Sequence, residues 1–85
     1  SADTLRQRIA AQPGDLQARA DLSRPLIAQA HSEQALDQLL EIVARNRTFG
    51  DDYGRKAALA VFDLMADRPD VVSAYRRRLA SALNR

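Results

Sequence analysis

The sequence DLQARADLSRPLIAQAHSEQALDQLLEIVARN, residues 15–46, decides the fold. In each half of this stretch, apolar and small residues recur at the spacing of one face of an α-helix. The junction at residues 30–32 is too short for anything except an antiparallel helix pair. Ser32 is expected to cap the second helix, with Glu33 favoured near its positive end. The recurring positions are Leu16, Ala20, Leu22, Ser23, Leu26, Ile27 and Ala30, then Ala35, Leu36, Leu39, Leu40, Ile42 and Val43.

Six of these positions have the spacing of a known repeat unit. The small residues Ser23 and Ala35 allow two helices to approach closely, and leucines fill the space between them. The stretch therefore resembles a tetratricopeptide repeat, a helix–turn–helix unit of about 34 residues. It departs from the pattern where Arg19 replaces Trp, Leu26 replaces Tyr and Arg47 replaces the closing Pro. The six positions are Leu22, Ser23, Leu26, Ala35, Leu39 and Ile42.

Pro25 lies inside the first of these two helices. Its nitrogen cannot donate a hydrogen bond to the carbonyl of Asp21, so a kink is expected. Leu26, Ile27 and Ala30 continue the same apolar face beyond it. We therefore expect a kinked helix and not a helix end at Pro25.

A leading helix is expected over residues 3–12, capped by Asp3 or Thr4, with Leu5 and Ile9 one turn apart. Pro13-Gly14-Asp15 then ends this helix and caps the next. In repeat register this helix corresponds to the second half of a severed repeat. The chain also begins at Ser1 without an initiator Met, so we expect it to be a fragment of a longer protein.

A second helix pair is expected over residues 51–84. Its first helix runs from Asp51 to about Ala66 and is apolar on almost every side except at Asp63. A helix of this kind is buried on several faces, so it is expected to be the central packing element of this half. Its second helix starts at Asp70, which is expected to cap it.

No strand pattern is present. The predicted fold is all-α: a single domain over residues 1–85 in which about five antiparallel helices form a right-handed, tetratricopeptide-like array. Its parts are the leading helix 3–12, the pair 15–46 and the pair 51–84.

The amino-acid composition excludes several kinds of site and disfavours one class of function. The chain has 85 residues, of which 46% are hydrophobic and none is cysteine, which excludes disulfides, a thiol nucleophile and a Cys-based zinc site. No apolar run approaches the roughly 20 residues that a membrane crossing needs. The 13 basic and 11 acidic residues give a net charge of only +2, which does not favour a nucleic-acid binder.

The C-terminal half carries a second resemblance. The leucine-rich LLEIVARNRTF is followed by Arg55-Lys56 before leucines and Phe62, and then by Tyr75-Arg76-Arg77 on the last helix. On these features, about residues 13–84 resemble the C-terminal helical region of bacterial thioredoxin-domain co-chaperones of the YbbN or CnoX type. The resemblance implies an N-terminal thioredoxin-like domain ahead of this chain and a cytoplasmic location. It also implies a co-chaperone that hands clients to the chaperonin and Hsp70 systems.

The residues that could carry chemistry have simpler explanations. His31, the only histidine, lies in the hairpin turn, and no strand–turn–helix elbow is present to hold a nucleophilic Ser. The acidic pairs Asp51-Asp52 and Asp67/Asp70 lack the alternating ligands and central Gly of a calcium loop. Both pairs flank expected helix starts, so capping is their expected role. No catalytic residue, metal ligand or cofactor is predicted.

Two groups of cations remain as candidates for contact with a partner. Arg76, Arg77 and Arg78 fan over about 200–300° of helix arc and cannot form one basic stripe. At least one of them is expected to pair with Asp63 or Asp67. Arg55 and Lys56 lie near a helix start, where cations oppose the dipole, although Asp51 and Asp52 can offset this. Their unfavourable placement indicates a role facing a partner.

We therefore expect a non-catalytic protein–protein interaction module that docks chaperone partners or client proteins. In repeats of this type, the first helix of each pair lines the binding groove. The candidate partner-binding residues are Gln17, Ala20, Arg24, Ile27 and Ala28 on that helix, with Arg55, Lys56, Arg76 and Arg77 further along the chain.

Two alternatives come from other classes: a structural homo-oligomerisation domain, and a small helical nucleic-acid binder that uses the C-terminal arginines. Self-association is expected to involve the N-terminal edge, because Leu5 and Ile9 offer little cover for Leu16, Leu22 and Leu26.

Overall fold

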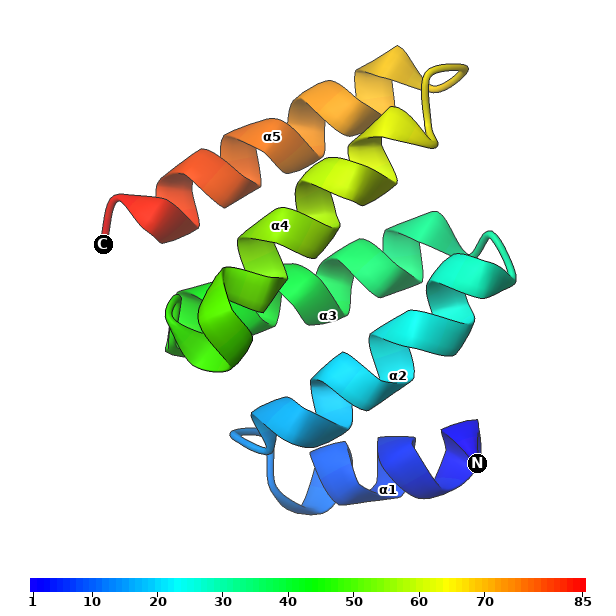
Figure 1. Cartoon of the computed structure of the whole chain (residues 1–85), viewed down its shortest axis with the longest axis vertical. Helices are drawn as coiled ribbons and strands as arrows, with labels where there is room; N and C mark the ends of the chain where they lie inside the picture. Colours follow the sequence, from blue (N-terminus) through cyan, green and yellow to red (C-terminus); the bar gives the residue numbers. More distant parts are fainter.

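Five α-helices and no strand make up the computed structural model, which describes all 85 residues (Figure 1). Successive helices reverse direction, and the array extends from α1 at one end to α5 at the other. The predicted all-α array of about five helices is confirmed. None of the five has the length and apolar character that crossing a membrane requires. The helices are α1 (Ala2–Ala11), α2 (Leu16–Ala28), α3 (Ser32–Arg45), α4 (Phe49–Asp63) and α5 (Pro69–Leu83).

The first two helices are capped by side chains. Ser1, and not Asp3 or Thr4, caps α1 by accepting the N–H of Thr4 at 3.3 Å. Asp15 caps α2 as predicted, with its Oδ1 accepting the N–H of Ala18 at 3.0 Å. This hydrogen bond is the main reason that the pKa of Asp15 lies below its usual value.

α3 and α5 have no side-chain cap, so the predicted caps Ser32 and Asp70 are wrong. His31 takes the cap position of α3 without a side-chain hydrogen bond, and Ser32 is the first helical residue. Arg68 precedes α5, and Pro69 is its first residue. Pro suits that position because the first N–H of a helix has no partner to lose. Asp70 follows in the first turn, where its charge complements the dipole.

The turn between α2 and α3 places an alanine in the left-handed region, with a φ of 60° at Ala30. The N–H of His31 donates to the carbonyl of Leu26 at 2.8 Å, and that of Ala30 donates to Ile27 at 3.0 Å. This pair of hydrogen bonds is the Schellman pattern of helix ends. It reverses the chain so that α3 packs against α2.

Pro25 lies within α2, which continues to Ala28, so the prediction that Pro25 does not end the helix is confirmed. Leu26 directly after it is 4% exposed and belongs to the core. The apolar face is therefore continuous across the proline.

α4 begins with a left-handed turn, where regular helix from Asp51 was expected. Gly50, Asp51 and Asp52 have φ angles of 60°, 56° and 65°. A non-glycine residue in this region costs about 1–2 kcal/mol, so two aspartates in sequence make a strained turn. Regular helix follows this turn and ends at Asp63, three residues before the expected Ala66.

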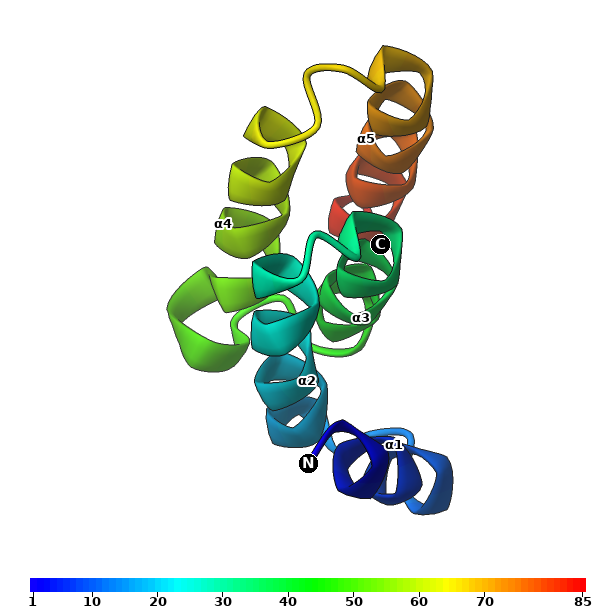
Figure 2. The same cartoon turned by 90° about the vertical axis from the view of Figure 1, so that its right-hand side faces the viewer.

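α3, and not α4, is the central helix. It packs against α2, α4 and α5, whereas the backbones of α4 and α5 stay apart (Figure 2). The buried residues of α3 cover an arc of about 160° of the helix, just under half of its circumference: Ala35, Leu36, Leu39, Leu40, Ile42 and Val43. α4 buries a narrower side and exposes Ala60 and Asp63, and Leu64 directly after it is also exposed. The expectation that the helix over residues 51–66 would be central is therefore wrong.

The core has two parts. The larger cluster joins α3, α4 and α5, and the smaller one consists of Leu22, Leu26 and Ala35, covered by half-buried residues of α1. Leu22 is 1% exposed, so the apolar face expected at the N-terminal edge is not present. The only large apolar side chain that is exposed is Leu64, at 68%. The larger cluster contains Leu36, Leu39, Leu40, Val43, Ala58, Val61, Phe62, Met65, Tyr75 and Leu79.

The six positions with repeat spacing are all buried, which confirms the helix register. One further close contact between helices was not predicted. Gly54 of α4 lies directly against α3. A Cβ at Gly54 would lie 2.8 Å from Cγ2 of Val43 and 2.9 Å from the carbonyl oxygen of Leu39. Glycine is required here because the neighbouring backbone oxygen cannot move aside.

Arg19, which stands where the repeat pattern has Trp, is buried at 9% exposure. Its Nε donates to the carbonyl of Pro13 at 2.9 Å, and its Nη1 donates to Oε1 of Gln38 at 2.9 Å. Desolvation lowers the pKa of the Arg19 guanidinium, and nearby Glu41 opposes that effect. Arg19 thus links the α1–α2 turn to α3 by hydrogen bonds instead of by an aromatic contact.

Candidate functional site

Four residues of α2 form a stripe on the side of the helix that adjoins α4. Gln17, Asp21, Arg24 and Ala28 recur at the spacing of one helix face, and all except the half-buried Asp21 are exposed. Together with Tyr53, near the start of α4, they form what we call the α2–α4 face. Three of the five predicted groove residues, Gln17, Arg24 and Ala28, lie on it.

The other two predicted groove residues are directed inward. Ala20 is 1% exposed, so its side chain is not accessible to a partner. Ile27 is half-buried and packs against both core clusters. The prediction is wrong for Ala20 because the side of α2 where Ala20 lies is covered by neighbouring helices.

Arg24 is held from two directions. Its Nη1 donates to Oδ1 of Asp21 at 3.2 Å, and the same oxygen accepts Nε2 of Gln17 at 2.9 Å. Its guanidinium carbon lies 5.0 Å from the ring centroid of Tyr53, within the range of a cation–π contact. The Arg24 side chain remains 57% exposed, so it is an ordered and accessible cation.

The Tyr53 ring is itself fixed by α2. The hydroxyls of Tyr53 and Ser23 lie 2.7 Å apart, and the hydroxyl of Ser23 lies 2.6 Å from the carbonyl oxygen of Ala20. Because Ser23 has one proton and donates it to that carbonyl, Tyr53 must be the donor in the bond between the hydroxyls. Ser23 is completely buried. This bond fixes the start of α4 against α2.

Arg55 and Lys56 are each paired with an aspartate of the left-handed turn. Nη2 of Arg55 lies 2.6 Å from Oδ2 of Asp52, and Nζ of Lys56 lies 3.2 Å from Oδ2 of Asp51. The hydrogen bond from Arg55 lowers the pKa of Asp52. Neither aspartate caps a backbone N–H, so the predicted capping role is wrong, whereas the predicted charge compensation is present. Both cations already have acidic partners within the chain.

The three consecutive arginines of α5 point in different directions, as predicted. The guanidinium carbon of Arg76 lies 4.8 Å from the centroid of Phe62 on α4. Arg78 turns toward α3, where it pairs with Asp37 at 3.1 Å and lies over the ring of Tyr75. The acidic partner is therefore on α3 and is neither Asp63 nor Asp67. Arg77 is exposed and forms no ion pair.

Tyr75 is a further link between α5 and α3. Its hydroxyl donates to Oδ1 of Asp37 at 2.8 Å. Burial, and then this bond to a carboxylate, raise the pKa of Tyr75. Asp37 therefore holds both Tyr75 and Arg78.

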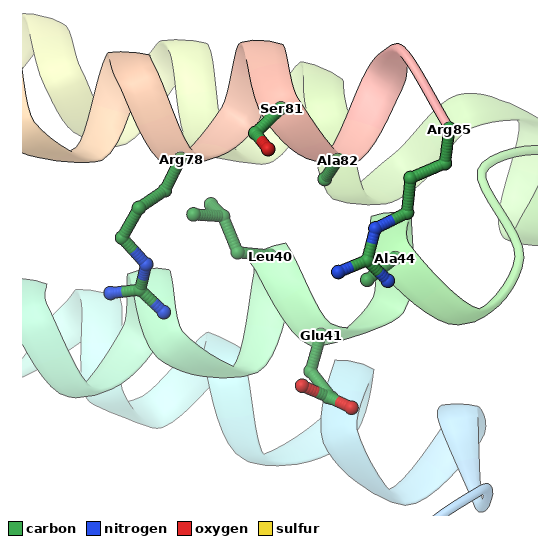
Figure 3. Close-up of a pocket in the computed structure, with 7 residues that line it drawn as sticks. All are labelled: Leu40, Glu41, Ala44, Arg78, Ser81, Ala82 and Arg85. Carbon is green, nitrogen blue, oxygen red and sulfur yellow. The ribbon is translucent and has the colours of Figure 1, made fainter.

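A surface hollow of about 220 Å³ lies between α3 and α5 (Figure 3). No motif or periodicity in the sequence indicated this hollow. The signal that could have indicated it is a set of small residues, Ala44 on α3 with Ser81 and Ala82 on α5, where two packed helices usually place larger side chains. We call this site the α3–α5 hollow. Its lining consists of Leu40, Glu41, Ala44, Arg78, Ser81, Ala82 and Arg85.

His31 is exposed in the α2–α3 turn. No group of three or more His, Cys, Asp or Glu side chains is arranged to hold a metal ion.

The comparison with family models gives one match, which covers nearly the whole chain. The family is described as tetratricopeptide repeat, and its model matches residues 1–84. Searches of curated proteins and of solved structures gave no significant match.

Proposed function

The chain belongs to the tetratricopeptide repeat family, and from that premise we propose that it is a non-catalytic protein–protein interaction module that docks a partner through the α2–α4 face. Proteins built from such repeats use extended surfaces of stacked helices to bind other proteins. The α2–α4 face is continuous across two successive helix pairs, because Tyr53 bridges them.

The observation that carries this proposal is the fixed position of Arg24. An exposed arginine normally loses rotamer freedom when it binds, at a cost of about 0.5–1.5 kcal/mol. Arg24 is already restrained by Asp21 and by the ring of Tyr53. A guanidinium stacked on an aromatic ring still presents free N–H groups to an acceptor. Arg24 therefore supports docking of a segment that offers carboxylate or carbonyl oxygens.

The resemblance to the co-chaperones supplies the biological setting of the proposal. In that setting the chain is the C-terminal part of a cytoplasmic, bacterial thioredoxin-like co-chaperone, and the α2–α4 face binds chaperone machinery or unfolded clients. Arg55 and Lys56, each paired with an aspartate, follow Tyr53 along α4. The chain contributes binding and no chemical step.

The test compares two arginines that have similar surroundings. Arg24 and Arg6 are both exposed, and each faces an aspartate three residues before it. Only Arg24 lies on the α2–α4 face. The purified chain is immobilised, and binding of a bacterial chaperonin, of Hsp70 and of a urea-unfolded model client is measured by interferometry. We expect Arg24→Ala to weaken binding of at least one of these about fivefold or more, and Arg6→Ala to leave it within twofold.

Failure of all three proteins to bind would contradict the co-chaperone setting. Equal losses for Arg24→Ala and Arg6→Ala would contradict the assignment of the α2–α4 face. Light scattering on the same samples addresses the alternative of a homo-oligomerisation domain. A stable dimer that buries Arg24 would replace the docking proposal with self-assembly.

A further inference from the structure

The α3–α5 hollow has no role in the proposed function, because it lies between a different pair of helices from the α2–α4 face. Three of its seven lining residues are apolar, namely Leu40, Ala44 and Ala82. Its rim is charged: Arg78 lies on α5, and Arg85 lies just beyond the end of that helix at Leu83. Figure 3 shows Arg78 at one end, beside Leu40, and Arg85 reaching past Ala44 at the other end.

The charges around the hollow leave a cation without a partner. On α3, Glu41 is paired with Arg45 at 2.7 Å, and Asp37 is paired with Arg78 at 3.1 Å. Arg85 takes part in none of the ion pairs of the chain. Each carboxylate beside the hollow is thus already neutralised, and the positive charge of Arg85 remains available at its mouth.

The size of the hollow limits what it can hold. About 220 Å³ is below the range of roughly 300–1,000 Å³ typical of small-molecule pockets. The volume suits one or two side chains of a peptide, with an apolar group against the apolar lining residues and a carboxylate at the rim. A phosphate backbone is a poorer fit, because the hollow offers one unpaired cation, Arg85, and not a row of cations for successive phosphates.

We propose that the α3–α5 hollow is a second docking site, which binds an acidic segment of a partner protein. Arg85, assisted by Arg78, binds a carboxylate of that segment through charge-assisted hydrogen bonds. A neighbouring apolar side chain of the segment packs on Leu40 and Ala82. The site operates independently of the α2–α4 face, so one chain can hold two segments at once.

The probe is a short dye-labelled peptide of alternating Glu and Leu, with a Gln/Leu peptide as its neutral counterpart. Fluorescence anisotropy at low ionic strength measures affinity for the whole chain. The Glu/Leu peptide is expected to bind about tenfold more tightly than the Gln/Leu peptide, and Arg85→Ser to remove most of that difference. The matched control is Arg77→Ser, which removes an exposed, unpaired cation of α5 that lies outside the hollow.

A second pair of variants tests the shape of the site. Ala82→Leu fills the hollow and is expected to weaken binding at least about fivefold, whereas Ala80→Leu, on an exposed side of α5, leaves it unchanged. Amide chemical shifts of the unmutated chain should move around Ala44 and Ser81 on peptide addition, and not around Arg24. These shifts separate the outcome from that of the α2–α4 face.

Four results would overturn the proposal. The first is no saturable binding of the Glu/Leu peptide up to about 1 mM, and the second is an equal loss of affinity for Arg85→Ser and Arg77→Ser. The third is a set of amide chemical-shift changes confined to the α2–α4 face. The fourth is tighter binding of a single-stranded oligonucleotide that depends on both Arg78 and Arg85. The last result would identify a nucleic-acid surface instead. Arg85 is exposed, so Arg85→Ser should fold normally. The test therefore remains valid even if Ala82→Leu does not fold.

Discussion

The two helix pairs of this chain are held together in different ways. α2 and α3 pack directly on each other, and small buried residues such as Ala18 and Ala35 permit the close approach. The backbones of α4 and α5 remain apart, and large side chains such as Phe62 and Tyr75 fill the space between them over α3. The two helices of the first pair contact each other directly, whereas those of the second pair depend on α3 as their support.

This difference indicates where the array is most sensitive. α3 belongs to the first pair by sequence, but most of its buried residues lie in the cluster that it shares with α4 and α5. Damage to α3 should therefore affect the second pair at least as strongly as its own hairpin. Removing a single contact between the first pair and α4 or α5 should have a smaller effect on the free energy of unfolding. Each of these effects can be measured by itself.

The largest expected effect comes from Leu39→Ala. Leu39 is completely buried in the cluster between α3, α4 and α5. Its truncation should cost about 2–5 kcal/mol in the free energy of unfolding, measured by urea denaturation. Arg45→Ala, on the exposed side of α3, should cost less than about 0.5 kcal/mol. Equal melting temperatures for the two variants would contradict the register of α3.

Hydrogen exchange on Leu39→Ala sharpens the comparison between the pairs. Amides of α4 and α5 should lose protection more than amides of α1, because α1 covers only the smaller cluster. Uniform loss of protection would show that the two pairs unfold as one unit.

Gly54→Ala should have the second-largest effect. The added Cβ would meet the carbonyl oxygen of Leu39 at 2.9 Å, so α4 must move away from α3. We expect a loss of about 1–3 kcal/mol by thermal or urea unfolding. Gly14→Ala is the matched control, because its Cβ would meet only Nη1 of Arg45 at 3.8 Å. A neutral Gly54→Ala would show that α4 is not fixed by this contact.

Tyr75→Phe removes the bond from α5 to Asp37 and should cost about 1 kcal/mol. It should also change the alkaline limit of stability. The pKa of Tyr75 is raised above its ordinary value of 10.0, so the folded chain retains a proton that the unfolded chain loses. The corresponding stability is complete below about pH 10 and is lost as the pH rises further. Unfolding at several alkaline pH values should show a weaker pH dependence in Tyr75→Phe than in the unmutated chain.

The tyrosinate absorbance provides an independent check. Asp37→Asn should lower the pKa of Tyr75 toward its usual value, because a carboxylate that accepts the bond is replaced by a neutral amide. An unchanged titration would mean that burial alone causes the shift.

The smallest effect is expected for Tyr53→Phe, at about 0.5–1 kcal/mol, because Ser23 keeps its bond to Ala20 when the Tyr53 hydroxyl is removed. A double-mutant cycle with Ser23→Ala measures the coupling between α2 and α4. Zero coupling energy would mean that the two pairs are joined only through α3.

The sequence was sufficient to predict the α2–α3 hairpin but not how α4 and α5 pack on it. Leu22 and Leu26 are buried in the hairpin as predicted, because helical periodicity and short turns dictate which faces meet. Leu39 is also buried, but in the cluster that α3 shares with α4 and α5 and not between the two hairpin helices. Periodicity could not show that α3, and not α4, is central, because both helices are rich in apolar residues. That distinction depends on the distance between α4 and α5, which is set by tertiary packing.

The candidate sites were harder to predict for a similar reason. Arg24 was identified from its place on α2, but Tyr53, which orders it, comes from a different pair and has no local signal. Asp51 and Asp52 were assigned as caps because they precede a helix, yet a left-handed turn directs them to Arg55 and Lys56. The α3–α5 hollow arises from residues about 40 positions apart and becomes visible only when the helices are packed.

The turn between α2 and α3 holds an alanine in a backbone conformation that favours glycine. Ala30 accepts a backbone conformation that a glycine would adopt freely, and the Schellman bonds keep it there. The single change Ala30→Gly should therefore raise the stability of the fold without altering either of the proposed binding surfaces. Natural proteins commonly retain such unused improvements, because selection acts on sufficiency and not on maximal stability. The reversal that defines the fold is therefore a position at which the molecule has not been optimised.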